Sequence, residues 1–95
     1  MKNEESLHIK YSQLFKKQLR EASINIKVSL REAREMFLYD PNHPALRNHA
    51  LHGKYAGFRS IDVTEDWRAL FKIRKSKLKT VITFHILGTH DQLYE

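Results

Sequence analysis

The chain has 95 residues, 41% of them hydrophobic, no cysteine, and 17 Lys and Arg against 11 Asp and Glu, which gives a formal net charge of +6. This length allows one hydrophobic core, so we expect residues 1–95 to form a single domain. The lack of cysteine excludes disulfides, thiol nucleophiles and cysteine-ligated metals, and the positive charge favours a polyanionic partner such as nucleic acid, or an anionic membrane.

The first forty residues predict one strand and two helices. Apolar and polar residues alternate over 7–11, as they do in a half-buried strand. Apolar residues then recur at helical spacing over 13–26, which predicts an amphipathic helix with its basic residues toward solvent. Ser29-Leu30-Arg31-Glu32 has the Ser-x-x-Glu form of a capping box, so we expect a second helix over 29–39 that ends at Asp40-Pro41.

The middle of the chain is irregular and rich in histidine. Residues 40–53 contain both prolines and no clean hydrophobic period, which predicts an extended loop that carries His43, His49 and His52. Functional side chains are often held on such loops. We therefore look for the chemistry of this chain here and in the residues that follow.

The remaining residues predict three strands. Apolar and polar residues alternate from Gly57 to Val63, over 67–73 and over 80–87, with a cationic turn at 74–79 and Gly88 after the last strand. The element order is then β-α-α-β-β-β. We expect an α+β fold in which two helices pack on one face of a small sheet that is mostly antiparallel.

The same alternation assigns side chains to the two faces of the sheet. The core face is predicted to hold apolar residues: Ile61, Val63, Trp67, Ala69, Phe71, Ile82, Phe84 and Ile86. The opposite face is predicted to be half open and to present polar residues: Ser60, Asp62, Arg68, Lys72 and His85, with Asp66 and His90 near strand ends. This face would be basic and would bear histidines.

Such a face carries the groups that RNA cleavage requires. One group takes the proton from the ribose 2′-hydroxyl, a second protonates the departing 5′-oxygen, and a cation stabilises the charged phosphorus centre. The candidates for proton transfer are His49, His52, Asp62, Asp66, His85 and His90, and those for phosphate binding are Lys54, Arg59 and Arg68. Composition and spacing alone, however, favour a plain basic domain with solvated histidines.

A histidine pair and the aromatic residues give weaker evidence about function. His49-x-x-His52 has no third ligand at a characteristic spacing, so we predict no metal and no cofactor. Trp67 and Phe71 fit the core better than a base-stacking surface. Tyr55 and Tyr94 lie outside the apolar alternation and are the aromatic residues placed to stack on a nucleobase.

Three sequence blocks, in this order and spacing, resemble the YafQ branch of the RelE toxins. They are His49-Ala50-Leu51-His52-Gly53-Lys54-Tyr55-Ala56-Gly57-Phe58-Arg59, then Asp66-Trp67, then Gly88-Thr89-His90-Asp91-Gln92-Leu93-Tyr94. The resemblance covers the second half of the chain in motif detail and the first half in element order. It implies a RelE-like fold and a ribosome-dependent mRNA endonuclease of a type II toxin–antitoxin pair, which needs no metal.

The resemblance also implies roles for single residues. His49, Asp66 and His90 match the family's acid–base residues, and Tyr94 stands at its C-terminal aromatic, which contacts the mRNA base. Asp62 stands where this branch often has a histidine, and can accept a proton. Ile86 stands where the branch often has an arginine, so the cation must come from elsewhere: Arg59, Arg68 or Lys54, with His85 one position from Ile86.

The partners implied by the resemblance are a cognate antitoxin, the ribosome with its mRNA and ribosomal RNA, and operator DNA reached only through the antitoxin. Positive charge outside the site, at Lys16, Lys17, Arg20 and over 74–79, would hold the protein against ribosomal RNA. A second reading is a non-catalytic ParE-like toxin that acts on DNA gyrase, or a nucleic-acid-binding module of the same fold. The histidine-rich site argues against the gyrase reading.

The sequence has no run of the roughly 20 apolar residues that span a bilayer, and residues 1–5 lack the apolar run of a secretory signal. We therefore expect a cytoplasmic protein that does not enter a membrane.

Overall fold

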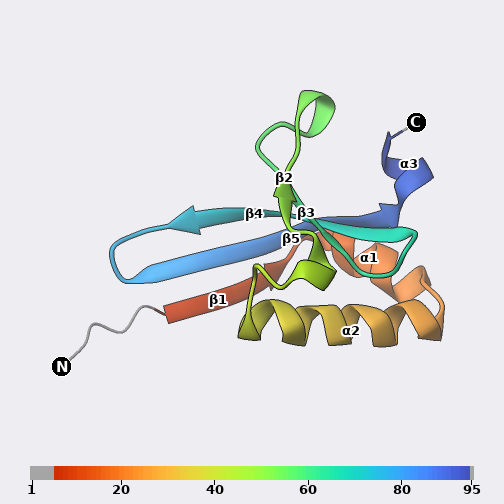
Figure 1. Ribbon diagram of the computed structural model, residues 1–95, viewed down its shortest axis with the longest axis horizontal. Helices are drawn as coiled ribbons and strands as arrows, with labels where there is room; N and C mark the ends of the chain where they lie inside the picture. The colour runs from red at the N-terminus through yellow and green to blue at the C-terminus, as the bar shows by residue number, and fades with distance from the viewer. Residues whose placement is uncertain (1–5, 95) are drawn as a thin grey trace.

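The computed structural model describes residues 6–94 as a five-stranded sheet with two helices beneath it (Figure 1). In chain order the elements are β1 (Ser6–Tyr11), α1 (Gln13–Glu21), α2 (Ile24–Tyr39), η1 (Pro44–Leu46), β2 (His49–Ala50), η2 (Gly53–Tyr55), β3 (Arg59–Asp62), β4 (Trp67–Lys75), β5 (Lys79–Thr89) and α3 (His90–Tyr94). The sheet order is β1-β5-β4-β3-β2, and only the β1–β5 pair is parallel. The predicted α+β fold, with two helices on one face, is confirmed.

The break between the two helices lies earlier than the sequence predicts. Ala22 is extended, and Ser23 caps α2 by accepting the backbone N–H of Ile26 at 3.3 Å. Ser29, predicted as the cap, lies inside α2, so that prediction is wrong. Both serines fit a cap in sequence, but a helix that begins at Ile24 adds more than a turn of backbone hydrogen bonds and keeps the same buried face, formed by Leu30, Ala33 and Phe37.

Ser12 joins α1 to the centre of the sheet. Its hydroxyl accepts the backbone N–H of Phe15 at 3.0 Å and donates to the backbone carbonyl of His85 in β5 at 2.9 Å. Since Ser12→Ala removes both bonds, we expect it to lower the free energy of unfolding by about 1–2 kcal/mol, measured by urea denaturation. Ser23→Ala, which removes a single exposed capping bond, is the control and should cost about half as much. Equal losses of unfolding free energy in the two variants would contradict a stabilising hydrogen bond from Ser12 to β5.

The core lies between the helices and the sheet, and Phe84 is at its centre. Phe84 is 1% exposed, and its ring centroid lies 5.4–6.0 Å from the rings of four other aromatic residues: Tyr11, Phe15, Phe37 and Phe71. Phe15 comes from α1, Phe37 from α2 and Phe71 from β4. One side chain of β5 thus connects both helices and two neighbouring strands.

A bulge in β5 changes which residues face the core. Leu70 pairs with Ile86 but Phe71 pairs with Phe84, so His85 is an extra residue on β5. After the bulge Leu87 joins the core, and Ile86 shares the opposite face with the fully buried Leu70. The prediction that Ile86 faces the core is therefore wrong, because a strict alternation of faces does not allow for an inserted residue.

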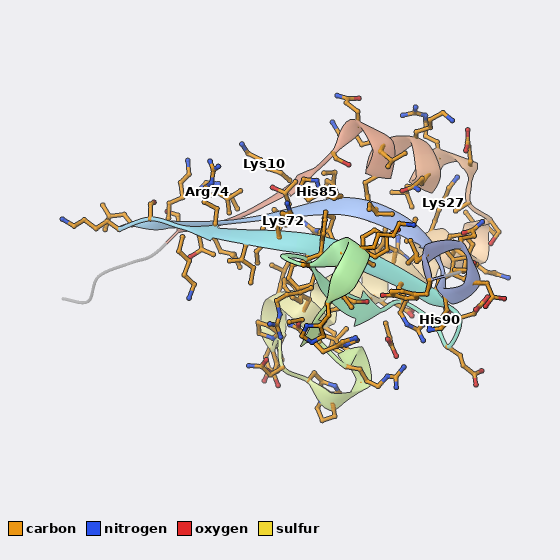
Figure 2. The ribbon with its side chains drawn as sticks, turned by 90° about the horizontal axis from the view of Figure 1, so that it is seen from above. Lys10, Lys27, Lys72, Arg74, His85 and His90 are labelled. Atoms are coloured by element: carbon orange, nitrogen blue, oxygen red, sulfur yellow. The ribbon has the colours of Figure 1, made fainter. Side chains whose placement is uncertain are left out.

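The face away from the helices is less open than predicted. Residues 51–58, with η2, rise above it (Figure 1), and Ser60, Arg68 and Leu70 are buried there. The exposed part of this face lies farther along β4 and β5, where Lys10, Lys72, Arg74 and His85 lie together, apart from His90 (Figure 2).

The β4–β5 hairpin extends past the helix layer (Figure 1). Every residue from Lys72 to Lys79 is exposed, and the segment contains Lys72, Arg74, Lys75, Lys77 and Lys79 with no acidic residue. Within residues 6–94 none of these cations forms an ion pair. None of the helices in that part of the chain is long and apolar enough to cross a bilayer.

Candidate functional site

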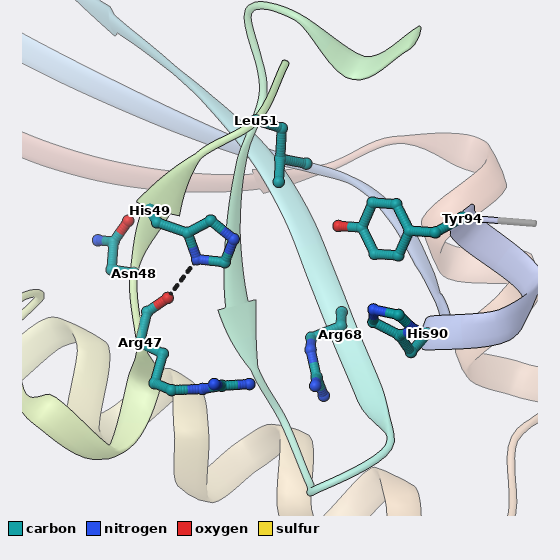
Figure 3. Close-up of a pocket in the computed structure, with 7 residues that line it drawn as sticks. All are labelled: Arg47, Asn48, His49, Leu51, Arg68, His90 and Tyr94. Carbon is teal, nitrogen blue, oxygen red and sulfur yellow. Dashed lines mark hydrogen bonds between the residues drawn. The ribbon is translucent and has the colours of Figure 1, made fainter. Parts of the chain in front are cut away.

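A pocket of about 500 Å³ lies between the turn that leads into β2, strand β4 and the terminal helix α3 (Figure 3). It is lined by Arg47, Asn48, His49, Leu51, Arg68, His90 and Tyr94. His49, Arg68, His90 and Tyr94 are among the site residues predicted from the sequence. The fold brings them together from three segments that are distant along the chain.

His49 lies on β2, opposite Ser60 of β3, and its ring is turned toward the pocket (Figure 3). Its Nδ1 is 2.6 Å from the backbone carbonyl oxygen of Arg47. Because a carbonyl oxygen only accepts, Nδ1 carries the proton of this hydrogen bond. The imidazole is thereby fixed in orientation, and Nε2 is left to take up or release a proton.

His90 and Tyr94 reach the pocket from α3. Thr89 and Gln92 form a reciprocal capping box, with the Thr89 N–H on Gln92 Oε1 at 2.8 Å and the Gln92 N–H on Thr89 Oγ1 at 3.1 Å. The ring centroids of His90 and Tyr94 are 4.8 Å apart, as expected for side chains one helical turn apart. This helix was not predicted from the sequence, although the Thr-x-x-Gln pattern of the capping box is its signal.

Asp66 contacts α3 through its backbone. Its carbonyl oxygen accepts the N–H of His90 at 2.8 Å, which fixes the first residue of the helix to the β3–β4 turn. The Asp66 side chain is exposed and does not line the pocket. Asp66 is thus next to His90 along the backbone contact, but the carboxylate of Asp66 is not part of the pocket wall.

Asp62 lies behind the pocket between two arginines. Its Oδ2 accepts a hydrogen bond from Arg47 Nε at 2.7 Å, and its Oδ1 lies 3.1 Å from Arg68 Nε in an ion pair that is not aligned as a hydrogen bond. Arg68 and Asp62 are directly opposite each other on β4 and β3. Arg47 was not among the residues predicted for the site, because nothing in an irregular loop indicates which side chain folds back toward the sheet.

Three predicted phosphate-binding or site residues lie outside the pocket. Arg59 points to the helix-covered side and donates to Asn48 Oδ1 at 2.8 Å, so it supports the pocket wall from behind. Lys54 is in η2, with its Nζ 5.3 Å from the centroid of the Tyr55 ring. His85 lies at the bulge, where its ring centroid is 5.5 Å from that of Phe58. None of the three faces His49 or His90 across the pocket.

His85 should make stability depend on pH. Burial, and then the positive charge of Lys72, lower the pKa of His85 below its usual value of 6.5. Below about pH 6.5 the unfolded chain binds a proton that the folded chain resists, so this contribution is present above pH 6.5 and is lost as the pH falls. His85→Gln should therefore lose less stability than the wild type between about pH 7.5 and about pH 5.5 in urea unfolding.

The control for His85 is His52→Gln, because His52 is an exposed histidine on the loop. It should keep the wild-type difference between the two pH values. An identical pH dependence of the wild type and His85→Gln would show that His85 has no part in it.

The described residues form no cluster of metal ligands at the site. Among residues 6–94, no three side chains of the types His, Asp and Glu come together as metal ligands. The chemistry that the pocket offers is that of two imidazoles, a guanidinium that faces solvent and an aromatic ring.

Solved structures show the same fold. The chain is similar to YafQ from E. coli strain BL21(DE3), with 23% identity and a TM-score of 0.70 over 95% of this chain and 100% of that one. A YoeB/ParE toxin from Agrobacterium tumefaciens matches with 12% identity and a TM-score of 0.71 over 87% and 98%. The E. coli DinJ–YafQ complex matches with 23% identity and a TM-score of 0.62 over 95% and 100%.

No curated protein sequence matches the chain significantly. Residues 7–95 match the family model described as the bacterial toxin of the type II toxin–antitoxin system, YafQ. The matched range includes the pocket, both histidines that face it and the sheet beneath. The chain therefore belongs to the YafQ family of type II toxins.

Proposed function

We propose that this toxin is a ribosome-dependent endoribonuclease that cleaves mRNA with its own side chains and thereby inhibits translation. The observation that carries the proposal is the pocket itself. His49 from β2 and His90 from α3 face it from two sides, and Arg47 and Tyr94 also line it (Figure 3). An acid, a base, a cation and a base-stacking ring are the parts that RNA cleavage needs.

The reaction follows from these groups. One imidazole takes the proton of the ribose 2′-hydroxyl, the 2′-oxygen attacks phosphorus, and the bond from phosphorus to the 5′-oxygen breaks. The other imidazole protonates that oxygen, so the products are a 2′,3′-cyclic phosphate and a free 5′-hydroxyl. His49 and His90 share these two roles. Asp66, bonded through its carbonyl to His90, is the further candidate of the acid–base set.

Tyr94 is suited to position the mRNA base. Tyr94 is 40% exposed, and its ring contacts that of His90, at 4.8 Å between centroids, and that of Tyr55, edge-on at 6.1 Å between centroids. A ring held in this way can stack on an unpaired base without losing much conformational freedom. Lys54 and Tyr55, next to it in η2, extend this surface toward the RNA backbone.

The basic hairpin supports binding to ribosomal RNA. The β4–β5 hairpin extends past the helix layer, and the cations among its exposed residues 72–79 form no ion pair within residues 6–94. Each phosphate that these cations contact releases counterions, so association with the ribosome should weaken steeply with salt.

We also propose a cognate antitoxin as partner. A solved complex of YafQ with DinJ has a toxin of the same family bound to a second protein. The net charge of +6 favours a partner segment with acidic residues that covers the basic face. Any contact of the toxin with operator DNA would then be made through the antitoxin.

The test uses the purified chain with ribosomes programmed with a defined mRNA, and maps the 5′ ends of the products. We expect cuts in the ribosome-bound codon, no cuts in naked mRNA, and 2′,3′-cyclic phosphate ends. The control mRNA carries a 2′-deoxynucleotide on the 5′ side of the scissile bond and should resist cleavage, because it lacks the attacking oxygen. Cleavage of that control, or intact mRNA after exposure to the wild type, would contradict the proposal.

The same preparation separates the alternative functions. A ParE-like toxin would inhibit supercoiling by DNA gyrase and leave the programmed mRNA intact. A module that only binds nucleic acid would retain the mRNA without cutting it.

A further inference from the structure

We propose that Arg47 supplies the cation that binds the scissile phosphate, and that Asp62 is the residue that positions it. The inference rests on the proposed endonuclease function. Ile86, two residues before Gly88-Thr89-His90, supplies no positive charge where the resemblance suggests an arginine, so the cation must come from another residue. The two arginines in the pocket wall are Arg47 and Arg68, and they differ in what the fold already requires of them.

Arg68 is committed to the fold. Its side chain is 8% exposed, and its Nη1 lies 3.0–3.1 Å from the backbone carbonyl oxygens of Thr64, Glu65 and Trp67. These contacts hold the β3–β4 turn, from which Asp66 reaches His90. If Arg68 turned toward a substrate, it would give up its hydrogen bonds to the carbonyls of Thr64 and Glu65 in this turn. Its remaining contact, with Asp62, fixes that carboxylate.

Arg47 is free to bind an anion. Its side chain is 64% exposed and is held by Nε alone, on Asp62 Oδ2 at 2.7 Å. Its two terminal nitrogens donate to no group in residues 6–94, which leaves the part of the guanidinium that fits two phosphate oxygens. Two guanidiniums and one carboxylate leave a net charge of +1, which matches one phosphodiester.

The backbone conformation of Arg47 also points to a functional site. Arg47 has φ 47° and ψ 47°, and among residues 6–94 it is the only residue other than glycine with a positive φ. This left-handed conformation is unfavourable for a residue with a side chain, and such strain is common at functional sites. Here it lets one residue orient the His49 ring through its carbonyl and reach Asp62 through its side chain.

Asp62 therefore acts through Arg47. Both of its carboxylate oxygens face guanidiniums, and it does not line the pocket. It stands where the resemblance suggests a proton acceptor, but its two contacts suit a residue that orients the guanidinium of Arg47.

The first test measures single-turnover cleavage of ribosome-bound mRNA at saturating ribosome concentration. Arg47→Ala should lower the rate by about 10²–10³-fold, as loss of one donor to a developing charge does, while the half-saturating concentration changes little. Arg47→Lys should recover part of the rate. The matched control is Arg31→Ala, which removes the same charge from the exposed surface of α2. If the wild type cuts and Arg47→Ala cuts within about threefold of it, the inference is wrong while the proposed function stands.

The second test asks whether Asp62 acts through Arg47. In a cycle of Arg47→Ala, Asp62→Asn and the double variant, the double variant should be no slower than Arg47→Ala alone, and Asp62→Asn should leave the shape of the pH–rate profile unchanged. If the fold losses in rate of the two single variants multiply in the double variant, or if Asp62→Asn removes one limb of the pH–rate profile, Asp62 is an independent proton acceptor. Either result would overturn the positioning role proposed for Asp62. Urea denaturation of each variant establishes that it is folded.

A third measurement does not depend on cleavage. Titration with inorganic phosphate, followed by NMR of the ring protons of His49 and His90, should shift both signals in the wild type and in Arg31→Ala, and neither in Arg47→Ala. Equal shifts in Arg47→Ala, or none in the wild type, would count against a phosphate site at Arg47.

Discussion

Replacement of His49 or His90 by alanine should lower the rate of mRNA cleavage on the ribosome by about 10²–10⁴-fold, the usual contribution of a positioned acid or base. Each variant removes one of the two imidazoles that face the pocket and leaves the other in place. Because both groups serve the same transition state, the double variant should be little slower than the worse single one. Single-turnover cleavage at saturating ribosome concentration measures the effect.

The control for this pair is His52→Ala, since His52 is three residues from His49 but is exposed and does not line the pocket. It should cut as fast as the wild type. Asp66→Ala belongs in the same series, because the Asp66 carbonyl that holds α3 remains when the side chain is removed. Any loss then reports the carboxylate. Undiminished cutting by His49→Ala, His90→Ala and Asp66→Ala together would reject the site.

Phe84→Ala should be the most destabilising single change, with a loss of about 3–5 kcal/mol in the free energy of unfolding. The substitution opens a cavity at the point where four other aromatic rings, two of them from the helices, converge. A chain of this size has little stability to spare, so the variant should be largely unfolded at 37 °C. Urea or thermal denaturation followed by circular dichroism measures the loss.

The matched change is Tyr39→Ala at the end of α2, where an aromatic side chain is 91% exposed. It should alter the free energy of unfolding by less than about 0.5 kcal/mol. A loss below about 1 kcal/mol for Phe84→Ala would mean that the core packs differently around β5.

The fold could be predicted because its signals are local. The alternation in β4 and β5, the apolar face of the helices and the stop at Asp40-Pro41 each lie within one element, and each led to the correct element type. The misplaced helix break and the misassigned Ile86 have different causes. Two serines fit the cap of α2 in sequence, and the earlier start gives the longer helix with the same buried face. The bulge at His85 depends on the pairing of β5 with β4, which no local signal in the sequence indicates.

The site was predictable only where a side chain lies on a regular element or in a recognisable block. His49, His90 and Tyr94 come from such blocks and line the pocket. Arg59 and Lys54 have the right charge in the right part of the sequence, but the pleat of β3 and the turn of η2 direct them elsewhere. Arg47 could not be found from sequence, since its position depends on a left-handed residue and on a carboxylate fifteen residues away.

The position of β5 in the sheet bears on when the pocket is complete. β5 lies between β1 and β4, yet it follows both of them in the chain, and the bond from Ser12 to His85 closes a separation of 73 residues. Contacts so distant in sequence form late, because the entropy of closing the loop must be overcome first. The nascent chain therefore has neither a closed sheet nor α3 until residues 79–94 have left the ribosome. A toxin with the proposed function would thus complete the pocket between His49 and His90 only after both segments have been translated.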